Sequence, residues 1–268
     1  MENENISMFG LLGFLDIEEY IFGIRNRTIE KFDLENKSAL SDAQKEIYRA
    51  LFPLMSWIVT QERMPSNKSF HAYVLINKAL NIIVSSLHLI RQRSTIEPLV
   101  LLRVALESAC TAIHIYHEDQ AYSDYQEQKY KSSNAVTYSK RYFKDIGKIW
   151  GDLSNKVVHI NSSMFGPKVK INDEATYIQE SSIKFDVIEE AAPNLDKMML
   201  TYLCLISTIL QKFVEIIFME GIRDNPEIYQ IKGSKSGRIG VDADHSIKKY
   251  CKKLEILEAE VTKKNSSG

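Results

Sequence analysis

The chain of 268 residues has few glycines and prolines, 11 and 6 respectively. Their combined share is about half of the usual one. β-Sandwiches and barrels need the turns that these residues make, so the shortage argues against both and favours helices. A surplus of basic residues is also lacking, because 34 lysines and arginines face 35 aspartates and glutamates, for a net charge of −1. Bulk charge therefore gives no general attraction to nucleic acid or anionic membranes, and only a local patch would provide one.

Cysteine and long apolar runs are scarce as well. Cys110, Cys204 and Cys251 are far apart and form no C-x-x-C pair, so neither a disulfide framework nor a thiolate zinc site is indicated. The longest strongly apolar uncharged run, 198–211, has fourteen residues, fewer than the ~20 that span a bilayer. Glu2 and Glu4 stand where a secretory signal would be basic. We therefore expect a cytoplasmic protein without a membrane partner.

Apolar residues recur at spacings of three and four along most of the chain, which predicts an all-α fold. We expect helices over 7–32, 41–63, 67–92, 95–117, 120–148 and 193–220, a short helical piece at 153–160 and a loop over 161–184. These elements predict a multi-helix bundle domain over 1–230 with a central buried helix, followed by a glycine-containing linker over 231–242. The C-terminal amphipathic helix and tail, 243–268, carry a heptad-like seam that could dock on the bundle, a second copy or a protein partner. That seam consists of Ile247, Tyr250, Leu254, Leu257 and Val261.

The predicted central helix carries one stripe of ionisable residues. Residues 99–112 are apolar on most sides, but Arg103 and Glu107 interrupt them four positions apart. At 100° per residue, Cys110, His114 and His117 fall on the same stripe. A buried charge without a partner is costly, so the stripe either forms an internal ion pair or lines a pocket. The two histidines could bind a metal at i, i+3, but no acidic partner motif accompanies them, so ordinary polar contacts, no metal and no cofactor are expected.

Two further places carry candidate chemistry. Arg91 and Arg93 precede the central helix, and they either form a solvated face or bind phosphate together with that helix's N-terminus. His159 is predicted at the C-terminal end of the short helix, which Ser154 can cap, with Lys156 one turn earlier. A histidine there either hydrogen-bonds open carbonyls or acts as an acid and base. An acid–base histidine beside a fixed cation is the minimum set for metal-free cleavage of a phosphodiester.

The run from Ile90 to Ser108 resembles a pattern found in a family of uncharacterised bacterial all-helical proteins. That pattern is a basic turn, an apolar helix with R-x-x-x-E, and a later L-S-x-x-x-H-like segment. Here Leu153, Ser154 and His159 would form that segment, with four residues rather than three before the histidine. Such proteins are similar in turn to the HEPN superfamily of helical bundles, many of which are metal-independent RNases of toxin–antitoxin and phage-defence systems. The usual R-x4–6-H signature is absent, and Lys156-x-x-His159 with Arg103 is the nearest substitute.

The resemblance implies a defence or toxin-type protein that binds RNA. If the chain is an enzyme, we expect metal-independent RNA cleavage, with His159 as the acid and base, Arg103 or Lys156 on the phosphate and Glu107 orienting Arg103. The residues expected to bind the substrate are Arg91, Arg93, His114 and Ser154. The alternative is a non-enzymatic helical sensor or adaptor that forms a homodimer or binds a protein partner through its last helix. A third hypothesis is a small-ligand binder whose pocket is lined by Arg103, Glu107 and His114.

Overall fold

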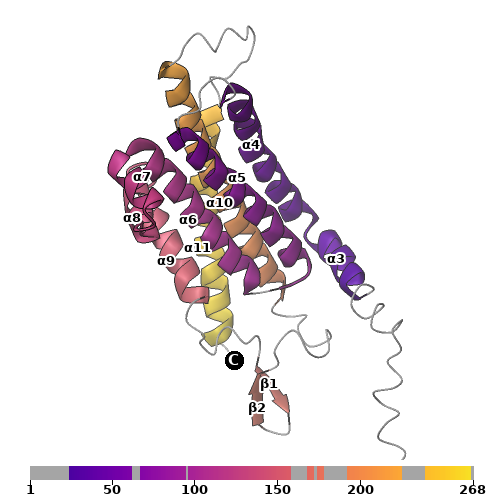
Figure 1. The fold of residues 1–268 in the computed structure, drawn as a ribbon. Helices are drawn as coiled ribbons and strands as arrows, with labels where there is room; N and C mark the ends of the chain where they lie inside the picture. Colours follow the sequence, from indigo (N-terminus) through magenta and orange to yellow (C-terminus); the bar gives the residue numbers. More distant parts are fainter. Residues whose placement is uncertain are drawn as a thin grey trace, which may run out of the picture.

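The computed structural model describes residues 24–61, 67–94, 96–157, 168–171, 174–177, 192–224 and 239–266, and it describes side chains over 29–55, 67–94, 96–155, 195–217 and 243–260. The predicted all-α class is confirmed, since a helical bundle makes up almost all of the described part (Figure 1). The elements are α3 (Ile24–Glu35), α4 (Lys37–Gln61), α5 (Asn67–Arg91), α6 (Glu97–His117), α7 (Asp119–Gln126), α8 (Ser132–Ser139), α9 (Ile146–Val157), β1 (Lys168–Ile171), β2 (Glu174–Tyr177), α10 (Ala192–Asp224) and α11 (Ile239–Ser266).

Helix α10 lies at the centre of the bundle and contacts α4, α5, α6 and α11. Every residue from Thr201 to Gln211 is buried, as expected for a helix that is apolar on all sides. Two of its buried hydroxyls are satisfied within the helix, since Thr208 donates to the carbonyl of Cys204 at 2.8 Å and Thr201 donates to the carbonyl of Lys197 at 2.6 Å. The sequence placed a central buried helix at 95–117, and the structure gives α6 that character too, with most of its side chains buried. The core is therefore shared by α6 and α10.

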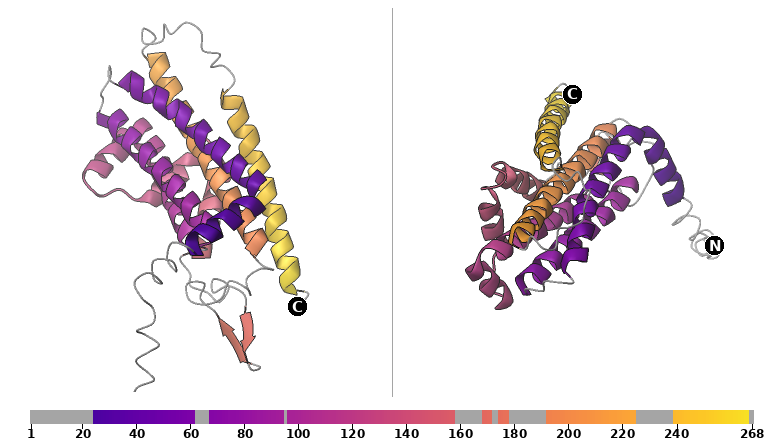
Figure 2. Two further views of the ribbon diagram at one scale, coloured as in Figure 1. Left: turned by 90° about the vertical axis from the view of Figure 1, so that its right-hand side faces the viewer. Right: turned by 90° about the horizontal axis from the view of Figure 1, so that it is seen from above.

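The last helix, α11, packs along α10, as Figure 2 shows from the side and from above. Its predicted seam is the packed face over the described side chains, because Ile247, Tyr250, Leu254 and Leu257 are all buried. The fifth seam residue, Val261, has its side chain outside the described part. A polar contact adds to this packing, since the Tyr250 hydroxyl donates to a carboxylate oxygen of Glu46 on α4 at 3.0 Å. Of the three predicted docking partners, the bundle of the same chain is thus the one that covers the seam.

The end of α5 explains the sharp turn into α6. The amide of Ser94 donates to the carbonyl of Leu89 at 3.0 Å and that of Arg93 to the carbonyl of Ile90 at 2.9 Å, which is a Schellman ending. Arg93 takes the left-handed position, with a φ of 57°, where glycine is usual. The predicted cap of α6 at Ser94 or Thr95 is wrong, because the N-cap is Ile96, which makes no side-chain cap hydrogen bond. Pro98 is compatible with this helix start, because proline has no backbone N–H that would need a partner in the first turn.

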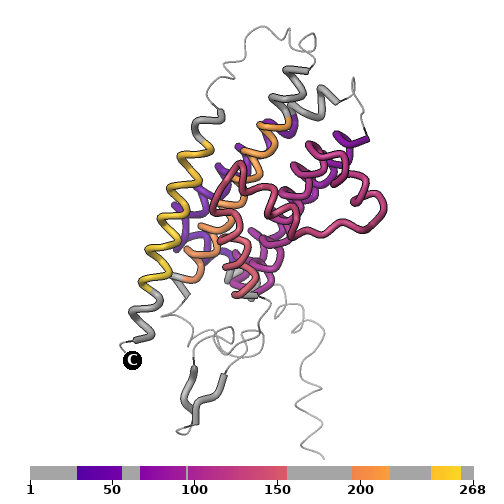
Figure 3. Tube along the Cα trace, turned by 90° about the vertical axis from the view of Figure 1, so that its left-hand side faces the viewer, coloured from indigo at the N-terminus to yellow at the C-terminus, as the bar shows by residue number. Residues whose placement is uncertain are grey.

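The predicted helix over 120–148 is broken into α7, α8 and the first turn of α9. The break has a local cause, since α7 also ends in a Schellman motif, with Gln128 at a φ of 58° and the Lys129 amide donating to the Asp124 carbonyl at 2.9 Å. The three short helices form a layer against one side of α6 (Figure 3). This layer covers the face of α6 that carries the predicted ionisable stripe.

Other boundaries differ in smaller ways. Helix α4 begins at Lys37, so the predicted capping box at Ser41 lies inside it. Helix α3 reaches Glu35 in place of 32, and the expected helical residues 7–23 lie outside the described part. The predicted loop over 161–184 contains two short antiparallel strands, β1 and β2, with Lys168 paired to Tyr177. Asn172 and Asp173, which separate the two strands in the sequence, lie outside the described part.

Three helices are long and apolar enough to cross a membrane, by length and composition alone. They are α5, α6 and the Leu195–Ile217 part of α10, whose most apolar windows are 33%, 61% and 83% buried inside the bundle. The apolar run 198–211 is limited to fourteen residues because it contains no charged residue, whereas the apolar window of α6 includes Arg103 and Glu107. The cytoplasmic location stays a prediction.

Candidate functional site

The predicted stripe of α6 faces the layer of short helices α7–α9. Four residues of the stripe contact aromatic side chains of this region. Arg103 and Glu107 contact Trp150 of α9, His114 contacts Tyr130 and Tyr138, and His117 contacts Tyr142. The side chains are half-buried, apart from the fully buried Cys110. The spacing argument that placed these five residues on one side of the helix is therefore correct, and their partners come from 130–150.

At the N-terminal end of the stripe, Arg103 and Glu107 form the predicted ion pair. The Arg103 Nε lies 3.1 Å from the Glu107 Oε1. The same oxygen accepts a hydrogen bond from the indole N–H of Trp150 at 2.7 Å. The Arg103 guanidinium carbon lies 5.2 Å from the Trp150 ring centroid, which is a cation–π distance. Their side chains are 25% and 21% exposed, so this cluster is a satisfied ion pair at the surface that solvent and ligands can still reach.

In the middle of the stripe, Cys110 is not a candidate nucleophile. Burial raises the pKa of its thiol to about 12. A thiol with that pKa carries almost no thiolate at neutral pH, and the thiolate is the reactive form. Cys110 is therefore a packing residue of the core.

His114 is held among tyrosines. Its Nδ1 lies 2.7 Å from the Tyr130 hydroxyl, and its ring stacks on Tyr138 at a centroid distance of 4.3 Å. Burial lowers the pKa of His114, so the imidazole is neutral near pH 7. His117 contacts the Tyr142 hydroxyl through Nδ1 at 3.1 Å. Among the described residues no group of histidines, cysteines and acids is arranged to hold a metal ion, and the two histidines have tyrosine contacts instead.

Of the residues predicted on the short helix, the structure describes only some. Ser154 lies on α9, and its hydroxyl donates to the carbonyl of Trp150 at 2.7 Å, so it does not cap the helix. Lys156 is on the last turn of α9, and its side chain lies outside the described part, as does the whole of His159. Lys156 is six positions after Trp150, which is about 9 Å along a helix axis.

Arg91 and Arg93 have carboxylate partners in place of an open phosphate site. The Arg91 guanidinium binds both carboxylate oxygens of Asp33, with the Nε–Oδ1 contact at 2.8 Å. Arg93 pairs with Glu35 of α3, and its Nε lies 3.6 Å from Asp196 Oδ2 of α10. These contacts join the α5–α6 turn to α3 and α10. The two arginines lie at a different place from the Arg103 cluster, so the structure does not bring the predicted substrate-binding residues together.

A pocket that the sequence did not indicate opens beside Trp150. It lies between α8 and α9, has a volume of about 510 Å³ and is within the usual size range of ligand sites. Its lining residues are Ser133, Val136, Thr137, Lys140, Lys144, Asp145, Gly147, Lys148 and Trp150. The three lysines recur every fourth residue, a spacing that is also common on a solvated helix face. The signal was hidden because the chain turns between α8 and α9, which gathers the lysines around one hollow.

Comparison of the chain with protein-family models, with curated proteins and with solved structures finds no match.

Proposed function

We propose that this chain is a HEPN-like protein of bacterial defence or toxin type that cleaves RNA without a metal ion. In this proposal, His159 exchanges protons with the reacting 2′-hydroxyl and the leaving oxygen. Arg103 or Lys156 stabilises the negative charge that develops on the phosphate. Glu107 keeps the guanidinium of Arg103 in place.

The observation that carries the proposal is the Arg103–Glu107–Trp150 cluster. Glu107 accepts hydrogen bonds from both Arg103 and Trp150. These contacts fix the guanidinium of Arg103 at the surface, outside the closed core. Because a quarter of its side chain remains exposed, Arg103 can contact an external phosphate. Trp150 lies on α9, the helix that carries Lys156 and precedes His159 in the sequence. The positioned cation thus contacts the helix that ends two positions before the predicted acid–base residue in the sequence.

The test is cleavage of total cellular RNA and tRNA by the purified full chain in EDTA. We expect discrete products, and His159→Ala should reduce the rate by at least about 100-fold, the usual contribution of an acid–base group. Arg103→Ala should cost about 100-fold or more. The control is Lys45→Ala, which removes an exposed cation from α4. Far-UV circular dichroism must show that each variant is folded. Intact RNA with the natural protein, or cleavage that survives both His159→Ala and Arg103→Ala, would contradict the proposal.

The second candidate function is a self-associating adaptor, and α4 favours it. Tyr48, Phe52 and Met55 follow one another at i, i+4 and i+7, and they are 71%, 66% and 52% exposed. An apolar stripe of this kind is self-complementary in a two-fold dimer, the commonest symmetric assembly. The predicted docking through the last helix is less favoured, because α11 uses its seam inside the bundle.

Light scattering after size exclusion tests the adaptor hypothesis. Tyr48→Ser with Met55→Ser should convert a dimer of the natural chain into a monomer. Lys45→Ser, on an exposed neighbouring position of α4, should leave the dimer unchanged. A natural chain that stays monomeric at high micromolar concentration would exclude self-association through this stripe.

A further inference from the structure

The pocket between α8 and α9 has an excess of positive charge. Lys140, Lys144 and Lys148 line it against one carboxylate, Asp145, which gives the lining a net charge of +2. This is a local concentration in a chain whose total is −1. Among the described residues, Lys140 and Lys144 have no ion-pair partner. Cations gathered in a hollow of low-dielectric walls attract anionic ligands more strongly than the same cations spread over a surface.

Lys148 has one competing partner. Its Nζ lies 3.8 Å from Glu255 Oε1 on α11, and the two side chains are 63% and 65% exposed. A pair at this separation in water contributes little to stability, so an incoming phosphate can replace the carboxylate. Glu255 therefore leaves the pocket available to anions.

Gly147 positions Lys140. A Cβ atom at residue 147 would lie 2.7 Å from Cε of Lys140 and 3.3 Å from its Nζ. The lysine chain thus crosses the first turn of α9 over Gly147, and a Cβ atom there would push its flexible end aside. A glycine inside a helix costs stability, and here the missing side chain lets a cation lie against the helix at the edge of the pocket.

Trp150 supplies the aromatic part of the lining. Its indole N–H is held by Glu107 at 2.7 Å, which fixes the orientation of the ring. Ser133 and Thr137 add hydroxyl groups on the α8 side. Lysines that contact phosphates, together with an aromatic ring on which a base can stack, are the combination that proteins use for single-stranded nucleic acid.

We propose that this pocket binds a single-stranded stretch of RNA, with the three lysines on its phosphates and one base stacked on Trp150. Three cations recurring along the chain fit several phosphates of a strand better than one terminal phosphate. The inference rests on the proposed ribonuclease function and names the surface that holds its substrate next to Arg103.

The test measures binding separately from cleavage. A fluorescently labelled 2′-O-methyl oligoribonucleotide keeps the phosphates and bases but lacks the 2′-hydroxyl nucleophile, so it cannot be cut. Fluorescence anisotropy with the full chain should show binding. A plot of the logarithm of the association constant against the logarithm of the salt concentration should have a slope of about −2, since each neutralised phosphate of a single strand contributes about −0.7. Lys144→Gln should reduce that slope by about 0.7, and the triple change of Lys140, Lys144 and Lys148 to Gln should weaken binding by about tenfold or more.

Two substitutions test the geometry rather than the charge. Gly147→Ala keeps all three positive charges and moves the flexible end of Lys140, so it should lower the affinity while leaving the slope near that of the natural chain. Trp150→Leu should weaken binding about tenfold without changing the slope, because stacking releases no counterions. Trp150→Phe retains a ring and should recover part of the affinity, which separates stacking from a folding defect. Lys45→Gln on α4 is the matched control and should change neither affinity nor slope.

The outcomes are distinct. A triple lysine variant that binds as the natural chain does, or no binding up to about 10⁻⁴ M, the weak end of non-specific affinity, would overturn the inference. Displacement of the strand by AMP at similar concentration would show a mononucleotide site and overturn it as well. Binding of the 2′-O-methyl strand without cleavage of natural RNA would refute the ribonuclease and leave this surface standing. Cleavage of natural RNA with an unchanged KM in the triple lysine variant would support the ribonuclease and overturn this binding surface.

Discussion

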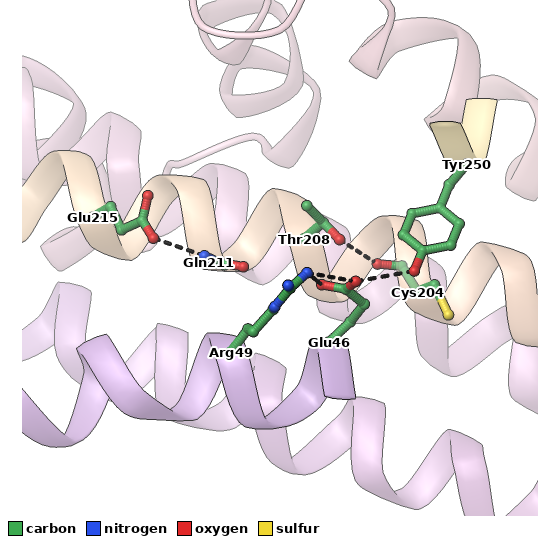
Figure 4. A network of polar contacts seen from close by, with 7 residues as sticks. All are labelled: Glu46, Arg49, Cys204, Thr208, Gln211, Glu215 and Tyr250. Atoms are coloured by element: carbon green, nitrogen blue, oxygen red, sulfur yellow. Dashed lines mark hydrogen bonds and ion pairs between the residues drawn. The ribbon is translucent and has the colours of Figure 1, made fainter. Parts of the chain in front are cut away.

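Single residues join the layers of the bundle through a few buried polar contacts. Glu46 is 3% exposed, a rare position for a carboxylate unless it is paired. Its Oε1 accepts from the Tyr250 hydroxyl at 3.0 Å and lies 3.1 Å from Nη1 of Arg49 (Figure 4). Burial raises the pKa of Tyr250, so the phenol stays a donor throughout the working range of pH. The contact thereby fastens α11 to α4 across the central helix.

Tyr250→Phe should lower the free energy of unfolding by about 1.5 to 3 kcal/mol, because it removes a hydrogen bond to a buried charged acceptor and keeps the ring. Urea unfolding followed by circular dichroism measures the change. Tyr48→Phe, which removes the same atom from an exposed ring on α4, should shift stability by less than about 0.5 kcal/mol. Equal losses in the two variants would show that Glu46 is satisfied by its other contacts.

Residue spacing within one helix was predictable, and pairing across the chain was not. The 100° rule placed Arg103 and Glu107 together, and their ion pair at 3.1 Å confirms it. Trp150 joins them from 43 positions away, a contact that no periodicity reveals. For the same reason, Arg91 and Arg93 looked like a free basic spot, since their acidic partners are 58 positions earlier.

At the scale of elements, the long apolar helices were predictable because burial imposes a repeat of 3.6 residues. The breaks were harder. Both left-handed helix ends, Arg93 and Gln128, use residues other than glycine, so the usual stop signal is missing. Arg93 is held there by its ion pairs with Glu35 and Asp196, a tertiary reason that local sequence does not contain. The pocket shares this origin, because it exists only where the chain turns between α8 and α9.

At the scale of the whole molecule, α11 decides whether the C-terminal region is an appendage or a part of the bundle. The sequence separated 243–268 from a bundle over 1–230, whereas α11 buries Ala243, Ile247, Tyr250, Leu254 and Leu257. Each buried apolar side chain of this size contributes about 1 to 3 kcal/mol. Removing α11 would also leave Glu46 buried without its phenol donor.

Truncation after residue 238 should therefore abolish cooperative folding of the remaining chain. The reason is that one face of α10 would be exposed along its length, and the core could not close over it. Thermal unfolding followed by circular dichroism, with size exclusion for aggregation, measures the effect. Truncation after residue 260 keeps all five buried side chains and should melt within a few degrees of the natural chain, about 2 to 4 °C for each kcal/mol lost. A shorter truncated chain that melts cooperatively as a monomer would show that α11 is an independent arm, and it would return the C-terminal helix to the partner-binding role.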